Sequence, residues 1–241
     1  MQMRAHADLI ENIPPHGFVR YINHLGTDQT IVEAARVSYG AKSKGEELDK
    51  KLLFYLYKNR HTSPFEQCSI TFNIKFPIFL MRQFVRHRTF RLNEISARYT
   101  ELPDEFFMPE SWREQDTKNK QGSLESTKIP QDLVNRTVEL AYQNIFAVYK
   151  TLIQLGVSKE QARFVLPVGI YTEIYVNCDI HNLMHFFRLR LDSHAQSEMR
   201  DVAQAMFRIF KELYPWTAEA YETHKLTFVQ AAVEINQTIL Q

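Results

Sequence analysis

Five arginines lie within one short stretch of a chain whose charges otherwise cancel. Residues 82–98 read RQFVRHRTFRLNEISAR and contain one acid, Glu94, whereas the 241 residues carry 29 Lys and Arg against 28 Asp and Glu. Arginine forms paired hydrogen bonds to phosphate and stays charged at any working pH. A solvated basic face or a surface for an acidic partner is the alternative. Interleaved apolar residues such as Phe84 and Phe90 favour partly buried arginines, which need an anionic ligand.

Two histidines offer a second kind of chemistry. His181 and His185 are four residues apart, the spacing of two zinc ligands on one helix face, and His194 is the candidate third ligand. Asn182 follows His181, where a zinc hydrolase of this type carries its glutamate base. Lone pairs at this spacing usually serve packing, and contact with another ligand is the third alternative, so we predict no metal site.

Glycine and cysteine usage exclude several kinds of site. The sequence has seven glycines and neither a Walker A nor a Gly-x-Gly-x-x-Gly pattern, so side chains must hold the phosphates of any bound nucleotide. Cys68 and Cys178 are the two cysteines, which excludes a disulfide framework and favours packing roles in a reducing, cytoplasmic setting. The N-terminus lacks the apolar core of a signal peptide, and no apolar run is long enough to span a membrane.

Two strands and a polar loop are predicted around these residues. Ile70, Phe72, Ile74 and Phe76 alternate along SITFNIKF, a half-buried strand that Pro77 stops. The β-branched and aromatic run GIYTEIYVN predicts a second strand, which contains Cys178 at or near its end. Residues 110–130 are polar and non-periodic, and we predict a mobile surface loop there.

Helical periodicity predicts the remaining elements. Asp28 is the expected cap of a first helix, and Asp179 of the helix DIHNLMHFFRLR, while IFLMRQFVRHR reads as a helix with cations in its last turn. The other expected helices span about 47–59, 134–155, 158–166 and 195–213. Gly156 ends the second of these, Ser158 and Gln161 form a capping box for the third, and the fourth, which is the last helix expected, stops at Pro215. The chain is therefore predicted to be a single α+β domain over 1–241, with a central, largely antiparallel or mixed sheet packed by long helices.

The arginine-rich stretch also matches a known signature. Arg86-His87-Arg88, followed after seven residues by Ser96, resembles the signature of flavin-dependent thymidylate synthases. ARVSYG, HTSPFEQ, QARFVLP and RLRLDSHAQ agree in the family's order, so the resemblance covers about residues 30–216. The chain departs from many members at Arg91, and at Asp179, His181 and His185, where the family often carries Asn and Arg.

The resemblance implies a bound FAD. The run Arg86-His87-Arg88 is implied to hold the flavin nucleotide, and Ser63 to touch the same cofactor. The full set of residues implied for the cofactor is Ser38, His61, Ser63, Arg86, His87, Arg88, Glu94, Asp179, His181 and His185.

The resemblance also implies deoxyuridine monophosphate (dUMP) as substrate. Arg98 and Arg163 are implied to bind its phosphate, and Arg190 is implied to stabilise the negative charge that develops on the pyrimidine. Ser96 is assigned to binding because no base can be assigned to activate it as a nucleophile. The implied substrate residues are Gln83, Arg86, Glu94, Ile95, Ser96, Ala97, Arg98, Arg163 and Arg190.

The expected activity follows from the resemblance. dUMP becomes thymidine monophosphate (dTMP), methylenetetrahydrofolate supplies the carbon, FAD carries the hydride and NADPH reduces the flavin. The family implies a homotetramer whose sites are shared between subunits, with no nucleic acid or membrane as partner. Two alternatives remain from the residues alone, namely a nucleic-acid-binding module built on residues 82–98 and a zinc hydrolase.

Overall fold

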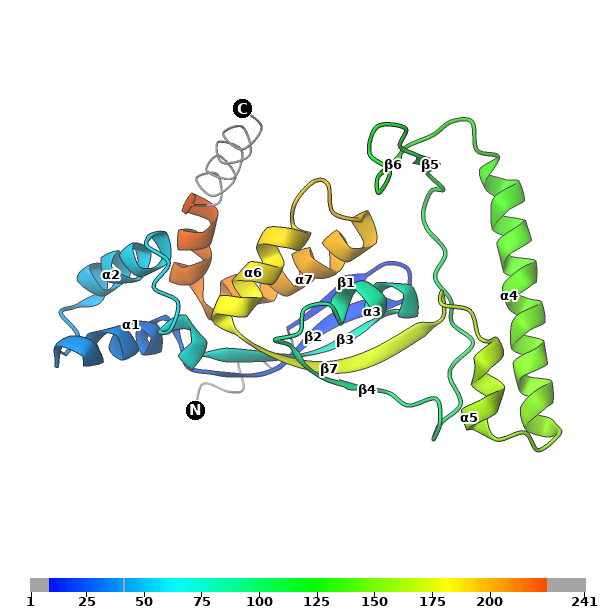
Figure 1. The fold of residues 1–241 in the computed structure, drawn as a ribbon, viewed down its shortest axis with the longest axis horizontal. Coiled ribbons are helices and arrows are strands. Elements are labelled where there is room, and N and C mark those ends of the chain that lie inside the picture. Colours follow the sequence, from blue (N-terminus) through cyan, green and yellow to red (C-terminus); the bar gives the residue numbers. More distant parts are fainter. Residues whose placement is uncertain (1–8, 41, 225–241) are drawn as a thin grey trace, which may run out of the picture.

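A five-stranded antiparallel sheet lies at the centre of the computed structural model, which describes residues 9–40 and 42–224 (Figure 1). The predicted α+β class and antiparallel sheet are confirmed. Its strands, in spatial order, are β1 (Ile10–Ile13), β2 (Gly17–Leu25), β3 (Ser69–Pro77), β7 (Tyr171–Asp179) and β4 (Arg91–Glu94).

Strand β3 is the central strand, and its alternation sets the core. Ile70, Phe72, Ile74 and Phe76 are all fully buried, as their spacing predicts, and Ile74 lies opposite Ile174 of β7. Helices α3, α6 and α7 cover this sheet in Figure 1. Since apolar side chains of β3, α6 and α7 share one core, the sheet fixes where α6 ends and where the turn after α3 lies.

The helices agree with the predicted pattern in most places. Asp179 caps α6 as expected, accepting a hydrogen bond from the backbone N–H of Asn182 at 2.9 Å. Ser158 precedes α5, although its side chain makes no capping bond. The helices are α1 (Asp28–Arg36), α2 (Glu46–Lys58), α3 (Ile78–Phe84), α4 (Gln131–Gln154), α5 (Lys159–Ala162), α6 (Ile180–Arg190) and α7 (Ser197–Leu213).

The prediction that α7 is the last helix is wrong. A further helix covers 215–224, with Pro215 in its first turn, where proline is favoured because no N–H is needed there. Asp28, predicted to cap its own helix, instead accepts from the N–H groups of Trp216 at 2.7 Å and Thr217 at 3.1 Å. Asp28 therefore caps a helix 188 residues away in sequence, and Thr27 is the N-cap of α1.

Helix α3 is shorter than predicted. It ends at Phe84, so Arg86, His87 and Arg88 lie in the turn that follows and only Arg82 lies in its last turn. The backbone N–H of His87 donates to Phe84 O, and the N–H of Phe90 to His87 O, which closes two successive turns. These turns place His87 against Phe186 of α6.

Residues 110–130 contain a short hairpin that the polar composition did not predict. β5 (Glu114–Gln115) pairs antiparallel with β6 (Ser123–Leu124). The segment is attached at one end by Arg113, whose guanidinium donates to Ser197 and Glu198 at the start of α7. The indole N–H of Trp112 donates to Asn135 of α4 at 2.7 Å, so the same segment also contacts the long helix.

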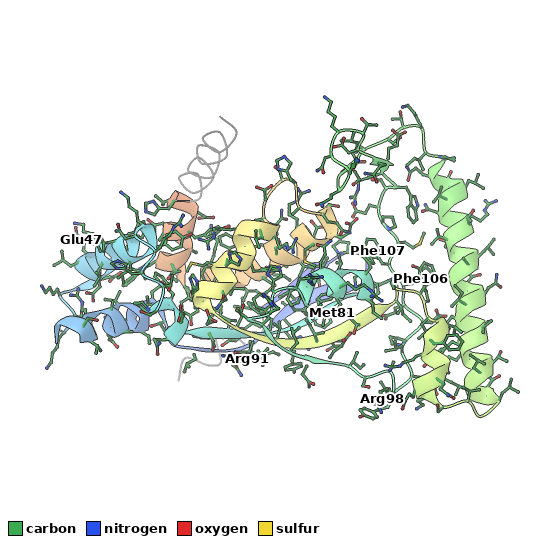
Figure 2. The ribbon with its side chains drawn as sticks, in the orientation of Figure 1. Glu47, Met81, Arg91, Arg98, Phe106 and Phe107 are labelled. Atoms are coloured by element: carbon green, nitrogen blue, oxygen red, sulfur yellow. The ribbon has the colours of Figure 1, made fainter. Side chains whose placement is uncertain are left out.

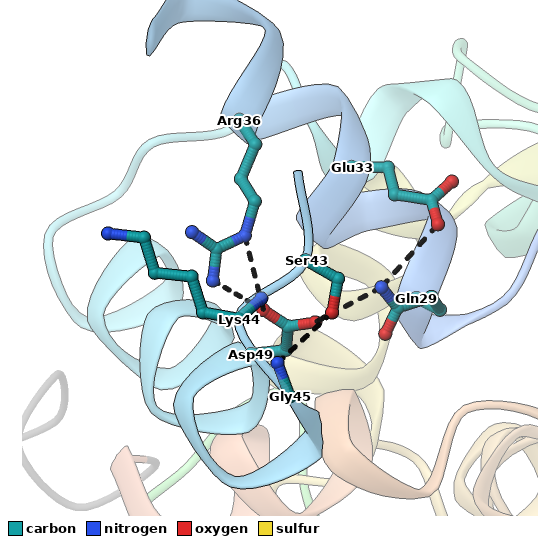
Figure 3. A network of polar contacts seen from close by, with 7 residues as sticks. All are labelled: Gln29, Glu33, Arg36, Ser43, Lys44, Gly45 and Asp49. Carbon is teal, nitrogen blue, oxygen red and sulfur yellow. Dashed lines mark hydrogen bonds and ion pairs between the residues drawn. The ribbon is translucent and has the colours of Figure 1, made fainter. Parts of the chain in front are cut away.

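A buried ion pair fixes the connection between α1 and α2. Arg36 Nε donates to Asp49 at 3.1 Å, and the two side chains are 9% and 0% exposed. Ser43, Gln29 and the backbone N–H of Lys44 complete the ring of donors around the carboxylate (Figure 3). Burial opposes ionisation, but these hydrogen bonds outweigh it and lower the pKa of Asp49 to about 2.

Helix α4 stands apart from the sheet at one end of the molecule (Figure 1). It covers the predicted range and is followed by Gly156 in the left-handed region. Leu133, Leu140, Val148 and Leu155 recur about two turns apart and are exposed, so one side of the helix presents apolar residues to solvent. In the part of the chain that the structure describes, no helix is long and apolar enough to cross a membrane.

Candidate active site

Two residues of the predicted site meet at the end of α6. Arg190 Nε donates a hydrogen bond to His87 Nε2 at 3.1 Å. His87 comes from the turn after α3 and packs edge-on against Phe186, with ring centroids 4.9 Å apart, and beside Phe90. Residues 103 positions apart in the sequence thus form one pair, which places the predicted catalytic guanidinium beside the arginine-histidine-arginine signature.

The environment of His87 determines its protonation. Burial, together with the positive charges of Arg190 and His185, lowers its pKa from 6.5 to about 4. The ring is therefore neutral at pH 7 and its Nε2 accepts from the guanidinium. Among the described residues, Nε is the nitrogen of Arg190 that hydrogen-bonds, which leaves the terminal amino groups for a ligand.

Three of the predicted cofactor residues line one cavity of about 410 Å³. His61 enters from the turn after α2, and His181 and His185 from successive turns of α6. Burial, with Arg188 and His181, lowers the pKa of His185. Sequence reasoning assigned no ligand contact to several other lining residues, which are Leu56, Tyr57, Arg60, Thr62, Phe65, Met184 and Arg188. Arg60 directly precedes the motif HTSPFEQ, and Arg188 begins the motif RLRLDSHAQ. Their position in or beside these motifs was the signal by which sequence reasoning could have found them.

Other predicted cofactor residues lie outside this cavity. Asp179 caps α6 and lines a separate, polar cavity of about 440 Å³ with Arg91 and Gln67. Ser63 is exposed beside His61, and Ser38 is exposed just after α1. Arg86 and Arg88 are exposed, and within 9–40 and 42–224 no side chain forms a hydrogen bond or an ion pair with either.

The predicted phosphate-binding residues form a second cluster. Glu160 accepts from Arg98 Nε at 3.4 Å through its carboxylate, and from Arg163 Nε at 3.2 Å through its carbonyl. Ser96 Oγ accepts from the backbone N–H of Arg98 at 3.3 Å, so the hydroxyl faces its own turn. Both arginines therefore contact Glu160 of α5.

The neighbouring residues of the signature run along the sheet edge. Glu94 accepts from Thr172 at 2.6 Å, the N–H of Ile95 donates to Glu173 O at 2.9 Å, and Ala97 is buried. Figure 2 shows Arg98 beyond the end of the sheet, beside α5. Among the described residues, no hydrogen bond or ion pair joins Arg98 or Arg163 to Arg190. A single chain therefore holds the predicted substrate residues in two separate groups.

Gln83, another predicted substrate residue, bonds to Gln196, a residue that had no assigned role. Its Nε2 donates to Gln196 Oε1 at 2.5 Å, across 113 residues of sequence. Gln196 ends the stretch RLRLDSHAQ and precedes α7. Sequence reasoning recognised the stretch as a whole, but the pairing of the two amides depends on the tertiary fold.

The α+β fold brings arginine and histidine side chains together from α6, the turn after α3 and the turn after α2. In the described residues, no group of three His, Cys, Asp or Glu side chains has the arrangement of a metal site. A family model described as thymidylate synthase complementing protein matches residues 20–216. The chain belongs to this family, which confirms the predicted resemblance and the predicted enzyme class, a methyltransferase.

Individual relatives support the same assignment. A flavin-dependent thymidylate synthase from Treponema denticola is 45% identical over 223 residues, covering 90% of this chain and 84% of the relative. One from Thermus thermophilus is 45% identical over 210 residues, covering 87% and 77%. The solved structure of a UMP/dUMP methylase, PolB from Streptomyces cacaoi bound with 5-Br dUMP, has a TM-score of 0.79 at 34% identity, covering 86% of this chain and 95% of that one.

Proposed function

We propose that this chain converts dUMP to dTMP, with 5,10-methylenetetrahydrofolate as carbon donor, FAD as hydride carrier and NADPH as the reductant of the flavin. The names of the relatives from Treponema denticola and Thermus thermophilus support the flavin, and the PolB complex supports a dUMP-like substrate. The observation that carries the proposal is the Arg190–His87 pair, since it fixes a guanidinium on α6, the helix whose His181, His185 and Arg188 line the cavity.

Arg190 activates the pyrimidine in this proposal. The ring carbon that accepts the methylene group must become electron-rich, and the ring carbonyl gains negative charge as the neighbouring nitrogen loses its proton. A guanidinium at that carbonyl stabilises the charge. His87 holds Arg190 by its Nε, and its low pKa keeps it an acceptor at pH 7. No residue acts as a covalent nucleophile, because Ser96 Oγ has no His, Asp or Glu hydrogen-bonded to it in the described residues.

The residues around the cavity fit a flavin nucleotide. Its volume of about 410 Å³ is within the ordinary range for ligand sites, and Tyr57, Phe65 and Met184 offer apolar contacts to a ring system. Arg60 and Arg188 at the same cavity, with exposed Arg86 and Arg88 nearby in the signature turn, supply cations for phosphates. When bound, the flavin supplies the hydride chemistry that protein side chains lack.

The proposed assembly is a homotetramer with shared active sites, built from a single-domain subunit in the cytoplasm. Two observations support the sharing. Arg98 and Arg163 lie apart from Arg190 within one chain, and α4 exposes an apolar side suited to a helix–helix contact. We propose that the segment 110–130, which Arg113 anchors at one end, is mobile in that assembly.

The experiment mixes purified protein with FAD, removes unbound ligand and records the visible spectrum before and after addition of dUMP. We expect retained flavin whose absorption bands shift with the nucleotide. Arg190→Ala is expected to abolish dTMP formation while NADPH still reduces the flavin. A folded oligomer that retains no flavin contradicts the cofactor, and an Arg190→Ala enzyme with unchanged turnover contradicts the role of the arginine.

A further inference from the structure

The histidine-lined cavity brings basic side chains together without a carboxylate. His61, His181, His185, Arg60 and Arg188 line it, and neither Asp nor Glu is among its lining residues in the part of the chain that the structure describes. Each cation in such a group disfavours protonation of the neighbouring histidines unless an anion lies between them. The cavity is therefore arranged for an anionic group, and the proposed FAD carries one in its pyrophosphate.

His185 lies next to a cation that keeps it neutral. His181, His185 and Arg188 share one face of α6, because they follow one another at steps of one helical turn. Arg188 Nη2 lies 3.5 Å from His185 Nδ1, and since a guanidinium can only donate, this nitrogen accepts and carries no proton. Burial, Arg188 and His181 lower the pKa of His185 from the ordinary 6.5, so the ring is mostly neutral at pH 7.

Other titratable and charged groups face this part of α6 from three sides. Most of them are cations or neutral side chains, and the two acids among them do not line the cavity. The groups are Tyr57, Arg60 and His61 in α2 and the turn after it, His87 with Arg190 at the turn after α3, and Tyr221, Asp192 and Glu222 on the far side of Arg188. An anionic ligand is therefore the means of making protonation of His185 favourable inside the cavity.

An anion in the cavity reverses the balance at His185. Arg188 gives up a long contact of 3.5 Å when it turns its donors to a phosphate oxygen, and His185 Nδ1 then no longer accepts from it. The negative charge favours the imidazolium form, which raises the pKa of the ring, and both ring nitrogens then donate. His185 is exposed in the single chain, so solvent can supply the proton.

We propose that His185 binds the flavin phosphates as an imidazolium that forms only when FAD enters the cavity, so that flavin binding takes up one proton. This inference rests on the proposed function. FAD binding then gains strength as the pH falls, and the gain is lost as the pH rises through the pKa that His185 has in the complex. One linked proton changes the dissociation constant by at most about tenfold per pH unit.

The test measures FAD binding to the full-length enzyme, freed of flavin, by titration calorimetry at pH 6, 7 and 8. FAD itself has no group that titrates between pH 6 and pH 8. At pH 7 the titration is repeated in two buffers of different ionisation enthalpy, because the difference in heat gives the number of protons taken up. We expect the wild type to bind FAD roughly tenfold more weakly at pH 8 than at pH 6, and to take up protons from the buffer at pH 7.

Three variants assign the proton to His185. His185→Asn keeps a polar side chain that cannot be protonated, so proton uptake is expected to disappear and the affinity to become the same at pH 6 and pH 8. Arg188→Gln removes the cation beside His185, so the free ring is protonated more readily and less is taken up on binding. His16→Asn is the matched control, since His16 lies against Tyr171 outside the cavity, and it keeps the wild-type uptake.

The outcomes separate this inference from the proposed function. A wild-type enzyme that binds no FAD at any of the three pH values overturns the proposed cofactor, and the inference with it. FAD binding without proton uptake overturns the inference alone, and so does undiminished uptake in His185→Asn. If His185→Asn binds no FAD, Arg188→Gln decides, because reduced uptake supports the role of His185 and unchanged uptake overturns it.

Discussion

His87 is neutral in this fold because it is packed among aromatic rings and lies beside the Arg190 cation. Its pKa of about 4 lies below the ordinary 6.5, so between these values the unfolded chain binds a proton that the folded chain does not. Stability therefore falls as the pH drops through that window. We predict that His87 Nε2 stays unprotonated at pH 5 in ¹⁵N NMR spectra. Arg190→Ala raises the pKa toward 6.5 and Arg208→Ala, a distant control, does not; an ordinary wild-type pKa contradicts the prediction.

Asp49 is the residue on which the α1–α2 connection depends. Its folded pKa of about 2 lies below the ordinary 3.8, so its contribution to stability is present above pH 3.8 and is lost as the pH falls through 2. Asp49→Asn leaves Arg36 buried without a counter-charge, and we predict a loss of about 3 kcal/mol in unfolding free energy. Urea unfolding at pH 7 measures this, with exposed Asp104→Asn as the control. A loss no larger than that of the control excludes a stabilising role for the pair.

Among the helices and strands, the sequence predicted those whose formation depends on residues close together in the chain. Alternation predicted β3, β-branched and aromatic composition predicted β7, the capping residue Asp179 marked α6, and a repeat of apolar residues marked α4. β4 was missed because Arg91–Glu94 lacks an apolar alternation and extends only through its pairing with β7. α3 was drawn too long because its end is set by the aromatic packing of Phe84 with Phe90 and Phe186, which no local pattern reveals.

The candidate site was likewise predictable in part, from local sequence but not from tertiary contacts. The signature supplied residue types such as His87 and Ser96, and their spacing on one segment is local information. The pairings that give them roles, Arg190 with His87 and Gln83 with Gln196, join segments more than 100 residues apart. A single sequence carries no signal for such pairings, so sequence reasoning could not predict them.

Helix α4 gives a prediction about assembly. Its exposed residues Leu133, Leu140, Val148 and Leu155 are expected to be covered by another subunit, because apolar surface of this kind is seldom left in water. Leu140→Glu places a charge in that contact, and we predict dissociation to smaller species with loss of activity. Light scattering after size-exclusion chromatography measures the mass, and circular dichroism checks folding. Gln143→Glu, at an exposed polar position of the same helix, is expected to keep the assembly; a Leu140→Glu enzyme of unchanged mass refutes the contact.

The whole molecule is elongated, with α6, whose last residue is Arg190, near its middle (Figure 1) and Arg98 toward the end where α4 and α5 stand (Figure 2). Arg190 and the Arg98–Arg163 cluster can contact the same small phosphate ester only if a second copy of the chain brings them together. A twofold contact does this twice, since each subunit then gives Arg190 to one site and Arg98 to the other. The separation of Arg190 from Arg98 and Arg163 within one chain therefore supports the proposed sharing of sites.

Complementation between two inactive variants tests this sharing. Arg98→Ala removes a phosphate ligand and Arg190→Ala removes the activating guanidinium, so each variant alone is expected to lack dTMP synthesis. In a mixed twofold pair, one site carries both substitutions and the other carries neither. Random mixing of equal amounts then restores roughly a quarter of the wild-type sites, and in the purified mixed pairs roughly one site in two is intact. Co-expression with two different affinity tags, sequential purification and a dTMP assay measure the recovery. Mixing two batches of Arg190→Ala is the control and stays inactive; mixed oligomers without activity show that each site is built from one chain.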